Sequence, residues 1–256
     1  MEFSKRMDLF GESIFTTLAL MRSERKKKDL EVVDLSIGAP NIPPTKEVME
    51  TIAQEAMKPE NYLYAITDTS ELQNTVRDWY MNRYGVTLDP ETEITSLLGS
   101  QDGLSHLALT IVNEGDTVLV QDPCYPIFRD GPLLAGAKVV SMPLLKENDY
   151  LIDFNEIDED TAKAAKFMIV SYPNNPTCGV ANPEFYKKLI AFAKKYNIMV
   201  LHDNAYSELL FEGHGHSFLE FEGAKDVGIE FNSLSKTYGL AGARIGFALG
   251  NKQMIE

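Results

Sequence analysis

The sequence predicts an α/β fold built on a mostly parallel central sheet with helices on both faces. Three observations support this prediction. Short apolar runs of the kind found in buried parallel strands alternate with helical segments along the chain. The chain has 256 residues, enough to bury a large core without disulfides. Hydrophobic residues make up 44% and charged residues 24% of the sequence, as in an ordinary globular protein.

The first predicted element is an amphipathic helix near the N-terminus. Its apolar residues recur at helical spacing: Phe10, Ile14, Phe15, Leu18 and Met21. We expect this helix to dock on the body of the protein or on a second subunit. A proline-rich turn over residues 39–44 follows. The sequence thus predicts an arm over residues 1–44 and a large domain over residues 45–256.

Helices dominate the first part of the large domain, and strands alternate with helices after it. The predicted helices cover residues 45–57, 69–84, 100–113 and 182–196, with Thr45 and Asn182 as caps. The predicted strands cover residues 117–121, 138–142, 167–171, 198–201, 227–231 and 244–249. Ligands of such sheets bind beyond the carboxyl ends of strands. The loops after Ser171, Leu201 and Phe231 are therefore the expected place for chemistry.

The first two of these loops carry polar residues. The segment YPNNPT, which contains Asn175, follows Ser171, and Asp203 and Tyr206 follow Leu201. A carboxylate at a buried strand end is costly unless it meets a cation or hydrogen-bond donors. The structural alternatives are a plain turn for the first loop and a helix cap for the second.

The third loop carries a lysine among small hydroxyl residues. Lys236 follows Ser233, and Arg244 comes 8 positions after Lys236. This pattern suits an amine nucleophile beside an anion site, and the alternative is a solvated loop lysine. Upstream, the segment 99–101 begins a helix, whose free N–H groups favour an anion. Tyr125 can stack on an aromatic ring, or it can simply pack in the core.

In this order, the motifs resemble those of pyridoxal-phosphate-dependent aminotransferases of fold type I, classes I and II. The segment NSLSKTYGLAGARIG over residues 232–246 is similar to the lysine signature of that family, and YPNNPT and DNAY occur at the expected spacing. The stretch 218–246 resembles bacterial LL-diaminopimelate aminotransferases and their relatives. The resemblance covers the chain from about Asp34 onward. It implies a transferase of amino acid metabolism, acting in a biosynthetic process, that moves an amino group from an amino acid to a 2-oxo acid.

The resemblance also implies a role for each candidate residue. Lys236 holds pyridoxal 5'-phosphate as a Schiff base and moves the substrate proton, while Asp203 pairs with the ring nitrogen. Tyr206 and Asn175 hydrogen-bond the phenolic oxygen of the ring, and Tyr125 stacks on its face. The residues implied to bind the phosphate are Ser100, Gln101, Ser233 and Arg244.

Two further residues follow from the resemblance alone. Gly38 matches a glycine whose backbone lies near the substrate carboxylate, so Gly38 and Asn175 are expected on the substrate side. Tyr64 matches a tyrosine that reaches the phosphate of a neighbouring subunit. A site shared between subunits implies a homodimer.

The sequence departs from the family pattern in two places. Cys178 stands where the family has a glycine, and Gly179 follows it, so the geometry of this turn is expected to differ. Family members continue into a small C-terminal domain, which carries the arginine that grips the substrate carboxylate. We therefore expect residues 45–256 to be the cofactor-binding large domain of a longer protein. By itself the chain should bind the cofactor weakly and transaminate nothing detectable.

The charge balance limits the partners. Lys and Arg number 24 and Asp and Glu 38, so the net charge is −14. Such a surface repels nucleic acid and anionic membranes. Cys124 and Cys178 cannot form a disulfide framework, and no segment resembles a signal peptide or a membrane span. These features favour a cytoplasmic protein.

Other functions share some of these features. A carbon–sulfur β-lyase of the same fold uses the same lysine, aspartate and tyrosine, and an inactive cofactor-binding fragment is a further alternative. Ser233 and Lys236 also match the S-x-x-K of penicillin-binding hydrolases, but the S-D-N and downstream K-T-G motifs of that class are missing. The four histidines lack metal-ligand spacing, so no metal is expected.

Overall fold

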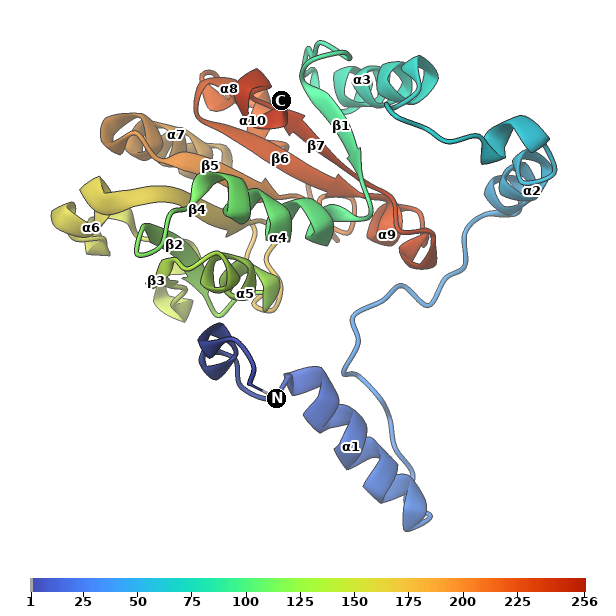
Figure 1. Cartoon of the computed structure of the whole chain (residues 1–256), viewed down its shortest axis with the longest axis horizontal. Helices are drawn as coiled ribbons and strands as arrows, with labels where there is room; N and C mark the ends of the chain where they lie inside the picture. Colours follow the sequence, from blue (N-terminus) through green and yellow to red (C-terminus); the bar gives the residue numbers. More distant parts are fainter. Residues whose placement is uncertain (1) are drawn as a thin grey trace.

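The computed structural model describes residues 2–256, and its centre is a seven-stranded sheet with helices on both faces (Figure 1). The strand order is β1-β7-β6-β5-β4-β2-β3. The strands are β1 (Ile94–Leu97), β2 (Thr117–Asp122), β3 (Lys138–Pro143), β4 (Ala165–Ser171), β5 (Met199–Asp203), β6 (Gly228–Ser233) and β7 (Gly246–Gly250). Neighbouring strands from β3 to β6 are parallel, and β7 is antiparallel to both β6 and β1. The predicted mostly parallel sheet is confirmed.

Two groups of helices cover the sheet. On one face, α3 (Ser70–Tyr84), α7 (Pro183–Tyr196) and α8 (Ala224–Val227) contribute to one buried cluster, and on the other face α4 (Ser100–Ile111) and α5 (Ile127–Leu134) contribute to a second. The remaining helices are α1 (Ile14–Lys27), α2 (Lys46–Glu55), α6 (Glu159–Ala164), α9 (Leu234–Thr237) and α10 (Lys252–Ile255). Because both faces are covered, the central strands are apolar along most of their length.

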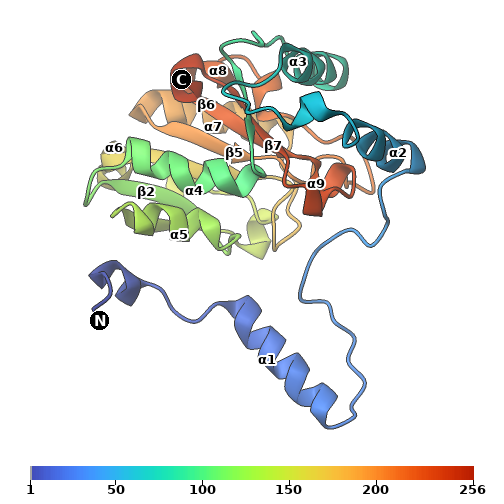
Figure 2. The same cartoon turned by 45° about the vertical axis from the view of Figure 1, so that its right-hand side comes forward.

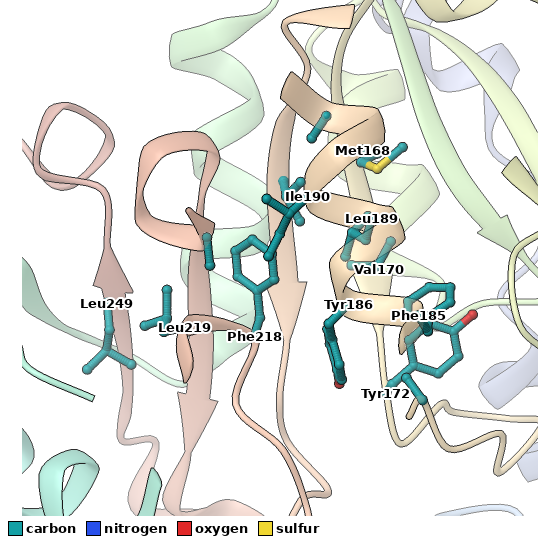
Figure 3. Packing of buried hydrophobic residues seen from close by; sticks show 14 of the residues in the cluster. Met168, Val170, Tyr172, Phe185, Tyr186, Leu189, Ile190, Phe218, Leu219 and Leu249 are labelled. Atoms are coloured by element: carbon teal, nitrogen blue, oxygen red, sulfur yellow. The ribbon is translucent and has the colours of Figure 1, made fainter. Parts of the chain in front are cut away.

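The first cluster shows how α7 is attached to the sheet. On this helix, Leu189 lies beside the strand residue Val170 and Phe185 packs against Tyr172, with ring centroids 4.8 Å apart, and Phe218 belongs to the same cluster (Figure 3). Burying one such side chain contributes about 1.5–3 kcal/mol relative to leaving it exposed. The cluster therefore stabilises the strands whose ends carry the candidate residues.

Local signals set the ends of the helices. Thr69 accepts a hydrogen bond from the backbone N–H of Leu72 (3.2 Å), and α3 ends at Gly85, which has a φ of 69°. Asn182 caps α7 by accepting from the N–H of Phe185 (2.9 Å). The predicted boundaries of α3 and α7 are confirmed. Helices α2 and α4 end at Glu55 and Ile111, each two residues before the predicted end, and the predicted cap Thr45 precedes α2 but its side chain makes no cap hydrogen bond.

The N-terminal arm differs from its prediction. Helix α1 begins at Ile14, so Phe10 lies outside it, and none of its residues is buried. Ile14, Phe15 and Met21 remain exposed, because α1 projects away from the sheet (Figure 2). The helix therefore does not dock on the body of this chain, and docking on a second subunit stays a prediction. Within residues 2–256 we find no helix with the length and apolar character needed to cross a membrane.

Candidate active site

The candidate residues gather at the carboxyl ends of the parallel strands. The strands run further than the sequence predicted: β5 includes Asp203 and β6 includes Ser233. Polar residues at a strand end look like loop in a sequence pattern, but here they continue the ladder, with Asp203 in register with Phe231. The expected loop position of Asp203 is thus wrong, and its backbone is held by the sheet. The last strand begins later than predicted, because β7 starts at Gly246 and Arg244 lies outside it.

Asp203 is a buried acid with an unused acceptor. The residue is 6% exposed, and its Oδ1 is buried without a hydrogen-bond partner among the described residues. Burial raises the pKa of Asp203 to about 7, the negative charge of Glu230 adds to the rise, and Lys236 opposes it. A cation or an N–H donor placed at Oδ1 would satisfy this carboxylate.

Lys236 lies on α9, directly after β6. Its Nζ donates a hydrogen bond to the carbonyl oxygen of Gly38 (2.7 Å) and lies 6.0 Å from the centroid of the Tyr206 ring. Burial lowers the pKa of the Lys236 amine, and the charge of Arg244 lowers it further, whereas Asp203 opposes this shift. The structure thus brings the arm residue Gly38 to the lysine.

Arg244 lies over the N-terminus of α4. A Cβ atom added to Gly99, which has a φ of 86°, would stand 2.4 Å from Nη2 of Arg244. Only glycine leaves room for the guanidinium at this point. Arg244 donates to the carbonyl oxygens of Ala241 (3.1 Å) and Leu98 (3.2 Å), and Gly99, against which it lies, is the N-cap of α4. A guanidinium next to a helix N-terminus forms a cradle for an anion.

Other candidates form pairs beside this cradle. The hydroxyl of Ser233 donates to the hydroxyl of Ser235 (2.9 Å), and the Tyr125 hydroxyl donates to Oε1 of Gln101 (2.9 Å). Ser235 and Glu230 were not among the predicted site residues. The S-x-S spacing before Lys236 is a signal for Ser235, and a charged residue within an apolar strand is a signal for Glu230.

Tyr206 and Asn175 come from the loops after β5 and β4. The Asn175 side-chain amide donates to the Tyr206 hydroxyl oxygen (3.4 Å). Burial and the charge of Asp203 raise the pKa of Tyr206, so its phenol keeps its proton at neutral pH. In the same loop as Asn175, Cys178 is exposed and has a φ of 60°, the left-handed conformation that a glycine adopts without strain.

Tyr64 is the candidate that the structure does not bring to the site. It follows the short helix η2 (Pro59–Tyr62), and its side chain is 95% exposed. No hydrogen bond joins it to the other candidates within residues 2–256. Its expected contact with the cofactor of a neighbouring subunit stays a prediction.

Comparison with known proteins shows which family has sequences like this one. The sequence profile described as aminotransferase class I and II matches residues 31–256. LL-diaminopimelate aminotransferases from Aquifex aeolicus and Halothermothrix orenii are each 43% identical to this chain, over 99% and 100% of its length. The chain spans 66% of the length of both relatives.

Solved structures agree with these relatives. Substrate-bound BacF from Bacillus subtilis superposes with a TM-score of 0.93 at 36% identity, covering 100% of this chain and 65% of that chain. A probable N-succinyldiaminopimelate aminotransferase from Thermus thermophilus gives a TM-score of 0.89 at 34% identity, covering 94% of this chain and 66% of that chain. These names do not favour the β-lyase or the inactive fragment that the sequence left open.

Proposed function

The chain belongs to the class I and II aminotransferase family, and from this membership we propose that the protein moves an amino group from an amino acid to a 2-oxo acid with pyridoxal 5'-phosphate as its cofactor. The proposal depends above all on one observation. Lys236 lies close enough to Asp203 and Arg244, at one edge of the sheet, for the charges of both to act on its pKa, and its own charge acts on the pKa of Asp203. An amine, a buried acid and a cationic fork match the aldehyde, the ring nitrogen and the phosphate of this cofactor.

Two features of the chain fit the cofactor. The unpartnered Oδ1 of Asp203 suits a protonated ring nitrogen. The Arg244 guanidinium, packed against Gly99 at the N-terminus of α4, suits a phosphate group beside it. The residues that would hold the phosphate are Ser100, Gln101, Ser233 and Arg244.

When bound, pyridoxal phosphate supplies an aldehyde that condenses with amines and a ring that withdraws electrons from the α-carbon of the substrate. Lys236 provides the amine that attaches to the cofactor and accepts the substrate proton at Nζ. The lowered pKa of this amine increases its neutral fraction, which is the form that can do both.

The remaining candidates orient the ring and the substrate. Tyr206 and Asn175 would hold the phenolic oxygen of the ring, a role supported by their mutual hydrogen bond. Tyr125 would lie against the ring face. Gly38 and Asn175 would contact the substrate carboxylate, and the contact between Gly38 and Lys236 supports the first assignment. LL-diaminopimelate is the first amino donor to test, since relatives that match the whole chain carry its name.

We propose further that the protein is a cytoplasmic homodimer. The exposed apolar residues Ile14, Phe15 and Met21 on α1, and Tyr64 with its 95% exposed side chain, support a second subunit as the partner of the arm. Sedimentation velocity of the purified chain over a range of concentrations tests this, and a monomer at all concentrations would contradict it.

The covalent role of Lys236 has a direct test. The chain is incubated with pyridoxal phosphate, reduced with borohydride and digested with trypsin for mass spectrometry. The adduct should lie on Lys236 in the wild type and in Lys163→Ala, a control at an exposed lysine, and it should be lost in Lys236→Ala. An adduct on another lysine, or none in the wild type, would refute the proposed function.

Transamination is measured separately, with LL-diaminopimelate and other donors and with 2-oxoglutarate as the acceptor. We expect no detectable turnover by this chain alone. A rate at or above ~1 s⁻¹ would mean that residues 1–256 already contain a group that grips the substrate carboxylate.

A further inference from the structure

Glu230 is a completely buried carboxylate in the centre of the sheet. Its side chain is 0% exposed, and five donors surround it. They are the hydroxyls of Tyr80 (2.9 Å) and Ser217 (2.9 Å), the Asn204 amide (3.0 Å), the Phe218 N–H (2.7 Å) and Nδ1 of His202 (3.1 Å). A buried carboxylate is very costly without donors, and this one accepts as many hydrogen bonds as two oxygens allow.

No full positive charge compensates Glu230 locally. Within residues 2–256 its one ion-pair partner is His202, and no lysine or arginine pairs with it. His202 Nδ1 donates to Glu230, and His202 Nε2 lies 3.4 Å from the hydroxyl of Tyr186, which can donate to it. These two contacts occupy both ring nitrogens of His202. The group of Glu230 and its five donors, the Glu230 cluster, therefore contains a buried carboxylate that no lysine or arginine neutralises.

The Glu230 cluster lies behind the candidate active site. His202 and Glu230 are in register on β5 and β6, as are Asp203 and Phe231. Because side chains alternate along a strand, Glu230 and His202 face one side of the sheet, and Asp203 faces the other. Asn204, which directly follows Asp203, donates to Glu230, so the two carboxylates belong to adjacent parts of one rigid frame.

A second connection leads to Ser233. The Asn232 side chain donates to the Tyr80 hydroxyl (3.0 Å), and its Oδ1 accepts from the backbone N–H of Ser233 (2.7 Å). The Glu230 cluster thus holds both the end of β5 and the end of β6. The charge of Glu230 also contributes to the raised pKa of Asp203, after burial.

We infer that Glu230 is a positioning residue whose buried negative charge adds to that of Asp203 and favours a protonated nitrogen in the ring of the bound cofactor. The inference rests on the proposed function. A cation at Asp203 is attracted by two carboxylates, one in contact and one across the sheet, and the low polarity of the interior weakens such attraction less than water does. Glu230 acts through this field, without touching the cofactor.

The substitution Glu230→Gln removes the charge with little change of shape. Tyr80 and Ser217 can rotate their hydroxyls to accept from the new amide, and Asn204 can turn its unpartnered Oδ1 toward it. We would measure the affinities of wild type and variant for pyridoxal phosphate and for its carbocyclic analogue, in which C–H replaces the ring nitrogen. Wild type should prefer the natural cofactor, and Glu230→Gln should lose about tenfold of that preference, the equivalent of one pKa unit.

Ser217→Ala is the matched control. It removes one hydrogen bond from the Glu230 cluster but keeps the charge, so a purely structural effect should change both affinities equally and leave the preference intact. An undiminished preference in Glu230→Gln would overturn the inference. A wild type without any preference, or without an adduct at Lys236, would instead refute the proposed function.

A spectroscopic measurement on the wild type keeps the inference testable even if Glu230→Gln does not fold. The ¹⁵N chemical shift of labelled cofactor bound to the chain distinguishes a protonated ring nitrogen from a neutral one. We expect the protonated form at pH 8. A neutral nitrogen in the wild type would overturn the inference.

Discussion

The N-terminal arm and the rest of the chain, here called the body, differ in how far their apolar side chains are buried. In the body, Phe167 and Phe218 are 0% exposed, whereas in the arm Phe15 is 45% and Met21 56% exposed. The arm has helical structure, but α1 buries none of its residues. The body is therefore stabilised by its own contacts, and the apolar residues of the arm gain stabilisation only against another surface.

The same division runs through the candidate site. Asp203 and Ser233 stand at the ends of paired strands, whose backbones the sheet holds in place. Gly38 reaches Lys236 through one hydrogen bond from a segment that no strand holds, and Tyr64 reaches nothing in the site. The sheet therefore holds the residues at its strand ends in place, while Gly38 comes to the site from the arm through a single contact.

The largest effect should come from truncating matched phenylalanines. Phe218→Ala leaves a cavity in the core and should lower the free energy of unfolding by about 3–5 kcal/mol. Phe15→Ala in the arm should change it by less than about 0.5 kcal/mol. Urea unfolding of both variants at one low protein concentration measures this. Equal losses would mean that the arm packs on the body in solution.

The next effect concerns the pH dependence of stability without cofactor. The pKa of Asp203 is raised from 3.8 to about 7 in the folded chain, so the native state binds this proton more tightly than the unfolded state. The resulting stability is fully present below pH 4 and is lost as the pH rises through 7. The ionisation of Asp203 should thus lower the free energy of unfolding of the wild type by about 3 kcal/mol between pH 5 and pH 8.

Asp203→Asn should abolish this dependence and be the more stable protein at pH 8. The control is Asp34 in the arm, where hydrogen bonds from Ser36 lower the pKa to about 2. The stability that a lowered pKa provides is lost only below pH 4, so Asp34→Asn should not alter the change between pH 5 and pH 8. Parallel pH profiles for wild type and Asp203→Asn would contradict the buried position of Asp203.

A smaller effect is expected at the anion cradle. Gly99→Ala places a methyl group against the Arg244 guanidinium, at a φ of 86° that costs a non-glycine residue about 1–2 kcal/mol. The variant should unfold at lower urea and bind pyridoxal phosphate more weakly, because the guanidinium has to move. Gly11→Ala in the arm meets no atom within 4 Å and should change neither quantity. Unchanged cofactor affinity in Gly99→Ala would argue against Arg244 as a phosphate ligand.

The smallest expected effect is a gain in stability. Cys178→Gly relieves the left-handed conformation of this residue and should raise the free energy of unfolding by about 0.5–1 kcal/mol. Thermal unfolding under reducing conditions measures it. A loss of stability would mean that the Cys178 side chain makes contacts that outweigh the strain.

The fold class, the alternation of strands and helices after residue 113 and the motifs that carry the candidate chemistry could be predicted from the sequence, although β1 and α5 were not among the predicted elements. These features depend on neighbours along the chain: alternating polarity, the Asn182 cap, and the residues around Lys236. The Gly85 and Asn182 boundaries could be predicted because the hydrogen bonds that make them span a few residues.

Contacts between residues far apart in the chain could not be predicted from the sequence. Tyr80 and Glu230 are 150 positions apart, and Gly38 and Lys236 are 198 positions apart, so no local pattern links them. The same holds for the extension of β5 to Asp203, since a strand end is set by the neighbouring strand with which it pairs. Burial, too, is a property of the assembled sheet. For this reason the charge of Glu230, its five donors and the raised pKa of Asp203 emerge only when β5 and β6 lie side by side.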